Sequence, residues 1–156
     1  MSVRLRTVGE AEKGQLRGML STYLQELSQY GAVDADYVYF DSYWTDQDRW
    51  PYFIDHGGAV AGFSLINTWS TSLKGTDFAV AEFYIKPEFR SVGVGKGAFT
   101  SLLERHPGIW ELSVLKDNHA AEKFWRQTIA TADVKAIERI ELDDVWIYRF
   151  MTAEQT

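Results

Sequence analysis

The segment from residue 86 to residue 97 constrains the fold of this chain most, because it must join a strand to a helix through a turn rich in glycine. It reads Lys-Pro-Glu-Phe-Arg-Ser-Val-Gly-Val-Gly-Lys-Gly. The apolar run 79–85 before it predicts a strand, and Pro87 ends that strand because proline cannot donate to a sheet ladder. The run 94–105 after it predicts a helix. A strand that passes through such a turn into a helix favours an α/β fold.

The patterns on either side of this unit extend it to a sheet with several helices. Apolar residues spaced three and four apart from Leu16 to Tyr30 predict a helix, and Thr7 with Glu10 has the spacing of a capping box at its start. Further strands are predicted over 3–8, 52–55, 59–69, 109–115, 134–140 and 145–150, and a last helix over 118–129. This order predicts an α/β (α+β) domain with a mixed, largely antiparallel central sheet of six to seven strands and helices on both faces.

The chain has the length of one domain. Its 156 residues show no internal repeat and no linker, so we expect a single domain over residues 1–150 and a C-terminal tail over 151–156. In the predicted strand 59–69, Ala61, Phe63, Leu65 and Trp69 share one face, which we expect to be buried. The segment 31–50 is aromatic and acidic and follows no period, so no element is predicted there.

Charge and composition exclude several classes of function. The formal net charge of −6 repels polyanions, so we do not expect a nucleic-acid partner. The chain has no cysteine, and its three histidines are isolated from one another, so neither a thiolate nucleophile nor a metal site is expected. No apolar run approaches the roughly 20 residues that span a bilayer. We therefore expect a cytoplasmic protein without a membrane partner.

The glycine-rich turn has the properties of an anion site. A helix N-terminus leaves its first amides unpaired, and the helix dipole favours a negative charge beside them. Gly93, Gly95 and Gly97 remove side chains that would keep a phosphate away from these amides. Arg90 and Lys96 add positive charge at the same place. The chemistry suits a pyrophosphate or a similar group.

The turn has features of three kinds of phosphate site. A Walker loop needs Gly-Lys followed by serine or threonine, which the turn does not contain. A dinucleotide fingerprint is closer, because Gly93, Gly95 and Ala98 fit its Gly-x-Gly-x-x-Ala form and Glu111 lies in the following strand. That fingerprint leaves its strand almost at once, whereas a longer connection separates Ile85 from these glycines. The third interpretation is a coenzyme A site.

Two patterns at matching separation favour coenzyme A. The first is Phe83-Tyr84-Ile85-x-Pro87-x-x-Arg90-x-x-Gly93-x-Gly95, and the second is Leu112-x-Val114 followed by Asn118-x-x-Ala121-x-x-Phe124. The first resembles motif A of the GNAT superfamily of acyl-CoA-dependent N-acyltransferases, and the second resembles the other half of its cofactor site. The order of predicted elements also matches over nearly the whole chain. The resemblance implies acetyl-CoA as the acyl donor.

The resemblance assigns a role to each residue of these patterns. Backbone amides of the turn would hold the CoA pyrophosphate beside Arg90, and these are the amides of Val92, Gly93, Val94, Gly95, Lys96 and Gly97. The backbone of Tyr84 and Ile85 would pair with the pantetheine arm as an added strand, and Asn118 and Phe124 would flank that arm. Each of three residues has an alternative structural role: Gly97 in close helix packing, Asn118 as a helix cap, and Phe124 in the core.

Direct acyl transfer needs a base for the amine and an acid for the leaving thiolate. Members of the family often carry the acid as a tyrosine after the phenylalanine of the last helix, where this chain has Trp125, which we expect to pack or to shape the pocket. Glu82 and Glu111 remain as candidate bases, and we choose Glu82 because a carboxylate inside an apolar strand needs a partner. A structural hydrogen bond is the alternative role. Strict alternation puts Glu82 on the face opposite Ile85.

These observations predict transfer of an acetyl group from acetyl-CoA to a primary amine of a small molecule or peptide. The segment 26–48 contains carboxylates and aromatic rings but no lysine or arginine, which suits a cationic acceptor; a solvated acidic loop is the alternative. We expect the aromatic residues in 37–50 to line a cleft or to form a homodimer interface. Two other functions stay open: a non-catalytic acyl-CoA-binding module of the same fold, and a nicotinamide-dependent oxidoreductase.

Overall fold

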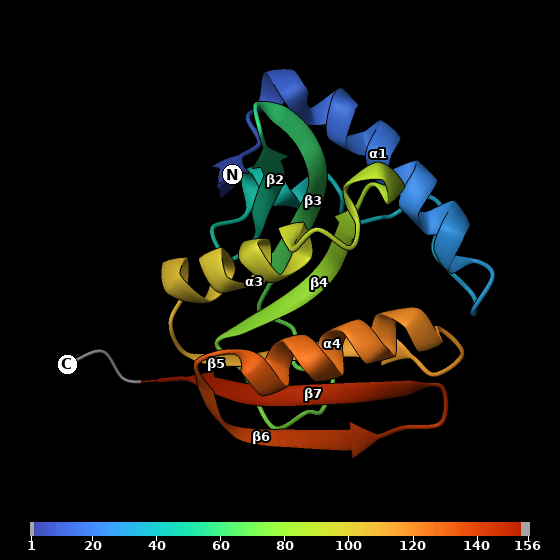
Figure 1. Cartoon of the computed structure of the whole chain (residues 1–156). Helices are drawn as coiled ribbons and strands as arrows, with labels where there is room; N and C mark the ends of the chain where they lie inside the picture. The colour runs from blue at the N-terminus through green and yellow to red at the C-terminus, as the bar shows by residue number, and fades with distance from the viewer. Residues whose placement is uncertain (1, 154–156) are drawn as a thin grey trace.

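The computed structural model describes residues 2–153, which fold around one seven-stranded sheet (Figure 1). The strands are β1 (Val3–Thr7), β2 (Trp50–His56), β3 (Ala59–Asn67), β4 (Phe78–Ile85), β5 (Ile109–Leu115), β6 (Val134–Glu141) and β7 (Val145–Thr152). The helices are α1 (Lys13–Leu27), α2 (Ser42–Thr45), α3 (Val94–Arg105) and α4 (His119–Thr131), with short 3-10 turns at Glu10–Glu12 and Pro87–Phe89.

The sheet is mixed, with one parallel pair. Its strand order is β1-β2-β3-β4-β5-β7-β6. Only β4 and β5 run parallel, because α3 carries the chain from the end of one strand back to the start of the other. All the other neighbours are antiparallel. The expected mixed, largely antiparallel sheet is thus confirmed.

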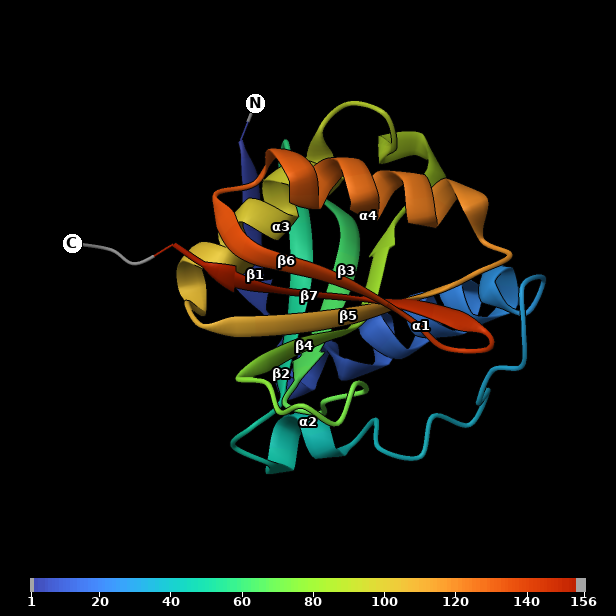
Figure 2. The same ribbon diagram turned by 90° about the horizontal axis from the view of Figure 1, so that it is seen from below.

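Helices cover both faces of this sheet. Figure 2 shows α3 and α4 on one side of the strands and α1 and α2 on the other. The stripe Leu16, Leu20 and Leu24 of α1 packs against Phe63 and Tyr84. On the opposite face, Phe99 and Leu102 of α3 and Trp125 of α4 pack with side chains of the strands, which include Trp110 of β5 and Phe150 of β7. Burial on both sides explains why the central strands are nearly continuous apolar runs.

The start of α1 differs from the prediction. Thr7 lies in β1 opposite Tyr52, so it does not cap the helix. A 3-10 turn that follows Gly9 leads into α1, which begins at Lys13. Because Thr7 is paired with β2 in the sheet, the predicted capping box does not form.

Two strand ends also differ from the prediction. Strand β3 ends at Asn67, whose side-chain oxygen accepts the backbone N–H of Trp69. This turn directs the Trp69 side chain outward, where it is 68% exposed instead of buried. Strand β7 continues to Thr152, so the first part of the expected tail belongs to the sheet, and residues 154–156 lie outside the described residues.

Candidate functional site

Strands β4 and β5 separate in the middle of the sheet. They pair only over residues 78–80 of β4 and 110–112 of β5. Beyond this point β4 remains paired with β3 as far as Ile85, and β5 remains paired with β7 as far as Leu115. A register shift against β3 leaves Ala81 as an extra residue in β4, and such bulges bend a strand and increase its twist. The two strands therefore diverge and open a wedge in the sheet.

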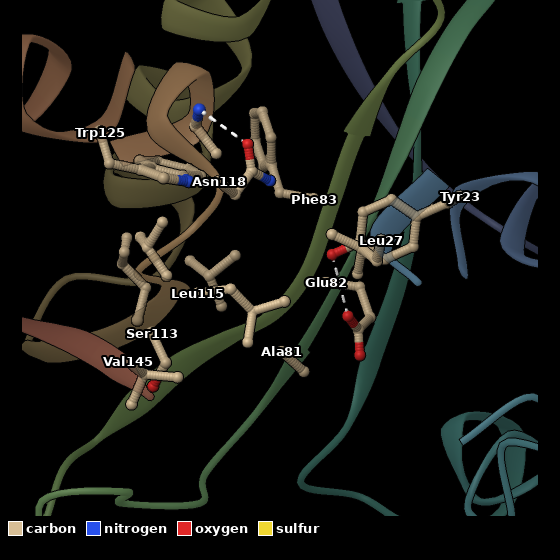
Figure 3. A pocket seen from close by; sticks show the side chains of 14 residues that line it. Tyr23, Leu27, Ala81, Glu82, Phe83, Ser113, Leu115, Asn118, Trp125 and Val145 are labelled. Atoms are coloured by element: carbon tan, nitrogen blue, oxygen red, sulfur yellow. Dashed lines mark hydrogen bonds between the residues drawn. The ribbon is translucent and has the colours of Figure 1, made fainter. Parts of the chain in front are cut away.

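Two pockets meet at this wedge. The turn pocket, of about 640 Å³, lies between α1, the glycine-rich turn and the first turns of α4. The wedge pocket, of about 260 Å³, lies between the diverging strands (Figure 3). Both pockets are lined by Tyr23, Leu27, Phe83, Asn118, Ala121 and Trp125. Where the two pockets meet, molecules bound in them would therefore contact the same side chains.

The glycine-rich turn forms one end of the turn pocket. Ser91 and Gly93 adopt the left-handed conformation, with φ of 66° and 85°. Helix α3 begins immediately afterwards at Val94, and its first amides have no partner in a preceding helical turn. Arg90 and Lys96 line the same pocket. The site thus combines a helix N-terminus with two cationic side chains, which suits an anion.

The Arg90 side chain also holds the end of β4. Its Nε donates to the Ile85 carbonyl over 2.7 Å, and its Nη2 lies 3.3 Å from a Glu26 carboxylate oxygen. The guanidinium also lies over the Tyr84 ring, 5.6 Å from the ring centroid. Arg90 therefore ties α1, β4 and the turn together, and part of its charge is balanced by Glu26.

Most of the predicted cofactor residues line the turn pocket, and three do not. Those that line it are Tyr84, Ile85, Arg90, Gly93, Gly95, Lys96, Asn118 and Phe124. Val92 points to solvent and is 65% exposed, whereas the Val94 side chain is buried in the core. A Cβ on Gly97 would lie 2.9 Å from Val3, which supports the role of Gly97 in close packing of α3 on β1.

Asn118 and Phe124 combine both roles that the sequence left open. The Asn118 side chain accepts the Ala121 N–H over 3.2 Å and so caps α4, yet it also lines both pockets. Phe124 packs on Trp125 in the core and also lines the turn pocket. A Cβ on Gly95 would lie 2.8 Å from the Phe124 ring, so the glycine makes room for this aromatic wall.

Trp125 is buried beside the same pockets. Its ring contacts Phe83, Phe99 and Phe124 at centroid distances of 4.9, 5.3 and 4.9 Å. It lines both pockets and is 7% exposed. The packing expected for this residue is therefore present.

Glu82 is the carboxylate of the wedge pocket. Its Oε1 accepts the Tyr23 hydroxyl over 3.0 Å, and its Oε2 accepts the Tyr37 hydroxyl over 2.6 Å. Figure 3 shows Tyr23 and Glu82 joined by a hydrogen bond, with Asn118 and Trp125 across the pocket. Glu82 lies on the α1 face with Tyr84, and Ile85 lies on the other face, as alternation predicts.

The surroundings of Glu82 suit proton transfer near neutral pH. Burial raises the pKa of its carboxyl from 4.5 to about 7, although the hydrogen bonds from Tyr37 and Tyr23 oppose part of this effect. Each carboxylate oxygen has a further lone pair beyond the one that a tyrosine occupies. Glu82 is thus hydrogen-bonded, as the structural alternative requires, and also able to exchange a proton.

Glu111, the second candidate base, has a structural role. Its oxygens accept the hydroxyls of Ser70 and Ser72 and the Ser72 N–H, and Arg149 forms an ion pair with it over 2.6 Å. Burial by itself would raise the pKa of Glu111, but the bonds from Ser72, Ser70 and Arg149 outweigh it and hold the pKa below its ordinary value. The residue fixes the β3–β4 loop to the sheet and lines neither pocket among the described lining residues.

Two residues of the site, Tyr23 and Tyr37, are not predicted from the sequence. The spacing of Tyr23 makes it part of the apolar stripe of α1, and Tyr37 lies in the segment without a period. Tyr37 has a left-handed φ of 49°, a conformation that is costly for a bulky residue. A buried tyrosine usually pairs its hydroxyl, and Glu82 was a strand carboxylate without a predicted partner, so the two signals together could have suggested the pair.

The acidic, aromatic segment finds its partners within the chain. Asp41 forms an ion pair with Lys13, and Glu26 pairs with Arg90. The Lys13 ammonium also lies 5.0 Å from the centroid of the Trp44 ring, and Arg49 lies over Tyr39 and Tyr43. The rings and carboxylates expected for a cationic acceptor are thus occupied in part by the chain's own cations. The carboxylate that lines the wedge pocket is Glu82, from β4.

Within residues 2–153 no cluster of three or more histidine, aspartate and glutamate side chains is arranged to hold a metal ion. In the same part of the chain no helix combines the length and the apolar character needed to cross a bilayer.

A family comparison matches most of this chain. Residues 15–129 match the model of the acetyltransferase (GNAT) family. The matched range includes Glu82, the glycine-rich turn and Phe124. No curated protein matches the sequence.

Solved structures share the fold at low sequence identity. An acetyltransferase from Thermus thermophilus has a TM-score of 0.71 and 13% identity, with 96% of each chain covered. The paia N-acetyltransferase from Thermoplasma acidophilum, in complex with coenzyme A, has a TM-score of 0.63 and 12% identity, covering 96% of this chain and 98% of its own. The yncA protein from Salmonella typhimurium, with its cofactor acetyl-CoA, has a TM-score of 0.59 and 12% identity, covering 100% of this chain and 97% of its own.

Proposed function

The chain belongs to the acetyltransferase (GNAT) family, and we propose that it transfers an acetyl group from acetyl-CoA to a primary amine of a small molecule or peptide. The observation that carries the proposal is the meeting of two pockets at the β4–β5 wedge. One pocket contains most residues of the predicted cofactor motifs, and the other contains a carboxylate with a pKa of about 7.

The turn pocket supports the binding of acetyl-CoA. In this proposal the pyrophosphate lies at the N-terminus of α3, where the first amides of the helix and the Lys96 ammonium favour negative charge. The pantetheine arm lies beside the β4 residues Tyr84 and Ile85, because β4 has no strand partner on its β5 side beyond residue 80. Phe124 supplies an apolar wall for the arm. Structures in the comparison that contain coenzyme A or acetyl-CoA share this fold.

The wedge pocket supports an amine acceptor. Its walls are largely apolar, with Leu112, Leu115 and Val145 among the lining side chains. Glu82 stands among them as the proton acceptor, and its pKa of about 7 leaves a large fraction ionised at neutral pH. The neutral amine attacks the thioester carbonyl, and Glu82 removes the proton that the nitrogen loses. The C–S bond then breaks, and coenzyme A leaves as the thiolate, which takes up a proton. A volume of about 260 Å³ favours an amine on a small apolar group.

Release of coenzyme A thiol tests the proposal. Wild type is incubated with acetyl-CoA and a panel of primary amines with apolar groups of graded size, and product is identified by mass spectrometry. Thiol release with at least one amine is expected, and kcat/KM should rise as the pH increases through about 7, where Glu82 ionises. The Glu82→Gln variant should lose roughly 100-fold in kcat while its dissociation constant for acetyl-CoA stays unchanged.

The matched control is Glu111→Gln, which alters the same residue type in the adjacent strand. Because Glu111 binds the β3–β4 loop and not the pockets, this variant should keep the wild-type kcat at a temperature where it is folded. A wild type that binds acetyl-CoA but releases no thiol with any amine is a non-catalytic binding module. Equal losses in the two variants would remove Glu82 from the mechanism.

A further inference from the structure

We propose that the Tyr23 hydroxyl protonates the departing CoA thiolate and recovers its proton from Glu82. This inference rests on the acetyl transfer proposed above. The proposal assigns the acid of the reaction to a tyrosine of α1. At the α4 position next to Phe124, where related proteins often carry a tyrosine as the acid, this chain has Trp125.

The proton balance of the reaction needs a path from nitrogen to sulfur. A neutral primary amine forms an amide and loses one N–H proton, while the C–S bond breaks and the thiolate gains one proton. In the proposed path the amine proton passes to Glu82, the Tyr23 O–H proton passes to the thiolate, and the Glu82 proton passes to the Tyr23 oxygen. Both residues then return to their starting states, and no other reactant is consumed.

The geometry places Tyr23 where such a path must run. Among the described residues that line both pockets, Tyr23 is the only one with a hydroxyl; the others have apolar, amide or indole side chains. Its oxygen already lies 3.0 Å from Glu82 Oε1, which is within range for direct proton transfer. The thiol would arrive from the turn pocket and the amine from the wedge pocket, so Tyr23 borders both reactants.

The charges around the pair keep Tyr23 protonated until the thiolate forms. Burial and the Glu82 charge raise the pKa of Tyr23 well above its ordinary value. Two groups face Glu82, the hydroxyls of Tyr23 in α1 and of Tyr37. Tyr43 of α2 lies next to Tyr37, and its ring centroid is 5.5 Å from the Arg49 guanidinium. A phenolate beside an ionised Glu82 is unfavourable, so transfer from Tyr23 is coupled to the proton that Glu82 has gained.

Tyr37 provides a matched control for Tyr23. It also donates to Glu82, over 2.6 Å, but it is not among the residues that line either pocket. Tyr37→Phe therefore removes one hydrogen bond from the base without removing a group at the reacting atoms. Loss of such a bond raises the pKa of a carboxyl, so less of Glu82 is ionised at a given pH. Raising the pH restores the ionised base and, with it, the activity.

The experiment compares kcat as a function of pH for wild type, Tyr23→Phe and Tyr37→Phe at saturating acetyl-CoA and amine. Tyr37→Phe should show its acidic limb moved to higher pH and a wild-type plateau above it. Tyr23→Phe should lie roughly 100-fold below wild type at every pH, with an unchanged dissociation constant for acetyl-CoA. A Tyr23→Phe variant that regains the wild-type plateau at high pH overturns the proposal, because Tyr23 then only positions Glu82.

Tyr23→difluorotyrosine keeps the hydroxyl and serves if Tyr23→Phe does not fold. Its more acidic phenol should move the basic limb of the kcat profile to lower pH, and a basic limb that does not move contradicts the proposal. Failure of the proposed function has a different signature, since wild type itself would then release no thiol. That result rejects both proposals, whereas an active wild type with an unaffected Tyr23→Phe variant rejects only this one.

Discussion

Two glutamates in apolar strands show how neighbouring groups decide what a carboxylate does. Glu111 receives two serine hydroxyls and a guanidinium, and these donors stabilise its charged form. Glu82 receives two tyrosine hydroxyls and no cation among its described hydrogen-bond partners, so burial dominates and its pKa rises to about 7. One glutamate is a fixed structural anion, and the other exchanges its proton near neutral pH.

At the residue scale, Glu82→Gln should change how stability depends on pH. Between pH 4.5 and about 7 the folded protein keeps a proton on Glu82 that the unfolded chain has released, so the stability from this group is lost as the pH rises through that range. The variant should therefore have a higher urea midpoint than wild type at about pH 8.5, and the difference should shrink toward about pH 5. Equal midpoints at both pH values would show that Glu82 is not buried as described.

Glu111→Ala should weaken the fold and spare catalysis. The change leaves Arg149 without its buried partner and frees two serine hydroxyls, so the free energy of unfolding should fall by about 3 kcal/mol in urea titrations at neutral pH. Because the pKa of Glu111 is depressed, wild type should lose this contribution as the pH falls below 4.5. A fully stable variant would contradict the structural role.

At the scale of elements, the β4–β5 wedge and the start of α3 create the site together. The wedge depends on the early end of one strand pairing and on the bulge at Ala81. Helix α3 contributes because glycines let it approach its neighbours: Gly95 makes room for Phe124 of α4, and Gly97 makes room for Val3 of β1. The same residue type thus shapes the pocket at one position and the core at the other.

Alanine at these two glycines should separate binding from stability. Gly95→Ala places a Cβ 2.8 Å from the Phe124 ring, so it should weaken acetyl-CoA binding about tenfold by calorimetry. Gly97→Ala places a Cβ 2.9 Å from Val3, so it should lower the melting temperature and leave binding unchanged. Both variants gain the helix propensity of alanine over glycine, so any difference between them in binding or melting temperature reports the packing of the added Cβ. Identical binding by both would contradict a pocket wall at Phe124.

At the scale of the whole molecule, a ligand that binds the folded chain must stabilise it. Acetyl-CoA at about 100 times its dissociation constant should raise the melting temperature by roughly 5–10 °C, because it binds across elements that separate on unfolding. NAD at the same concentration should give no shift. Stabilisation by NAD and not by acetyl-CoA would instead favour the oxidoreductase interpretation.

The fold was largely predictable because its signals are local. The periods of α1 and α3, the strand 109–115 and the glycine-rich turn each occupy a short stretch of sequence, and their order limits the topology. The predictions that were wrong concern residues at the ends of elements. Thr7 pairs with β2 and is therefore not a helix cap, and a turn at Asn67 ends β3 before Trp69, which is exposed instead of buried.

The sequence by itself determined that a glycine-rich turn joins a strand to a helix, that a second motif follows at the right separation, and that the chain belongs to the family in which both motifs occur. The tertiary structure alone decided that β4 and β5 diverge, that Glu82 meets Tyr23 and Tyr37, and that Glu111 is held by Arg149. The reason is physical. Backbone periods and turn chemistry act between near neighbours in sequence, whereas the pKa and the role of a carboxylate depend on burial and on donors from distant elements.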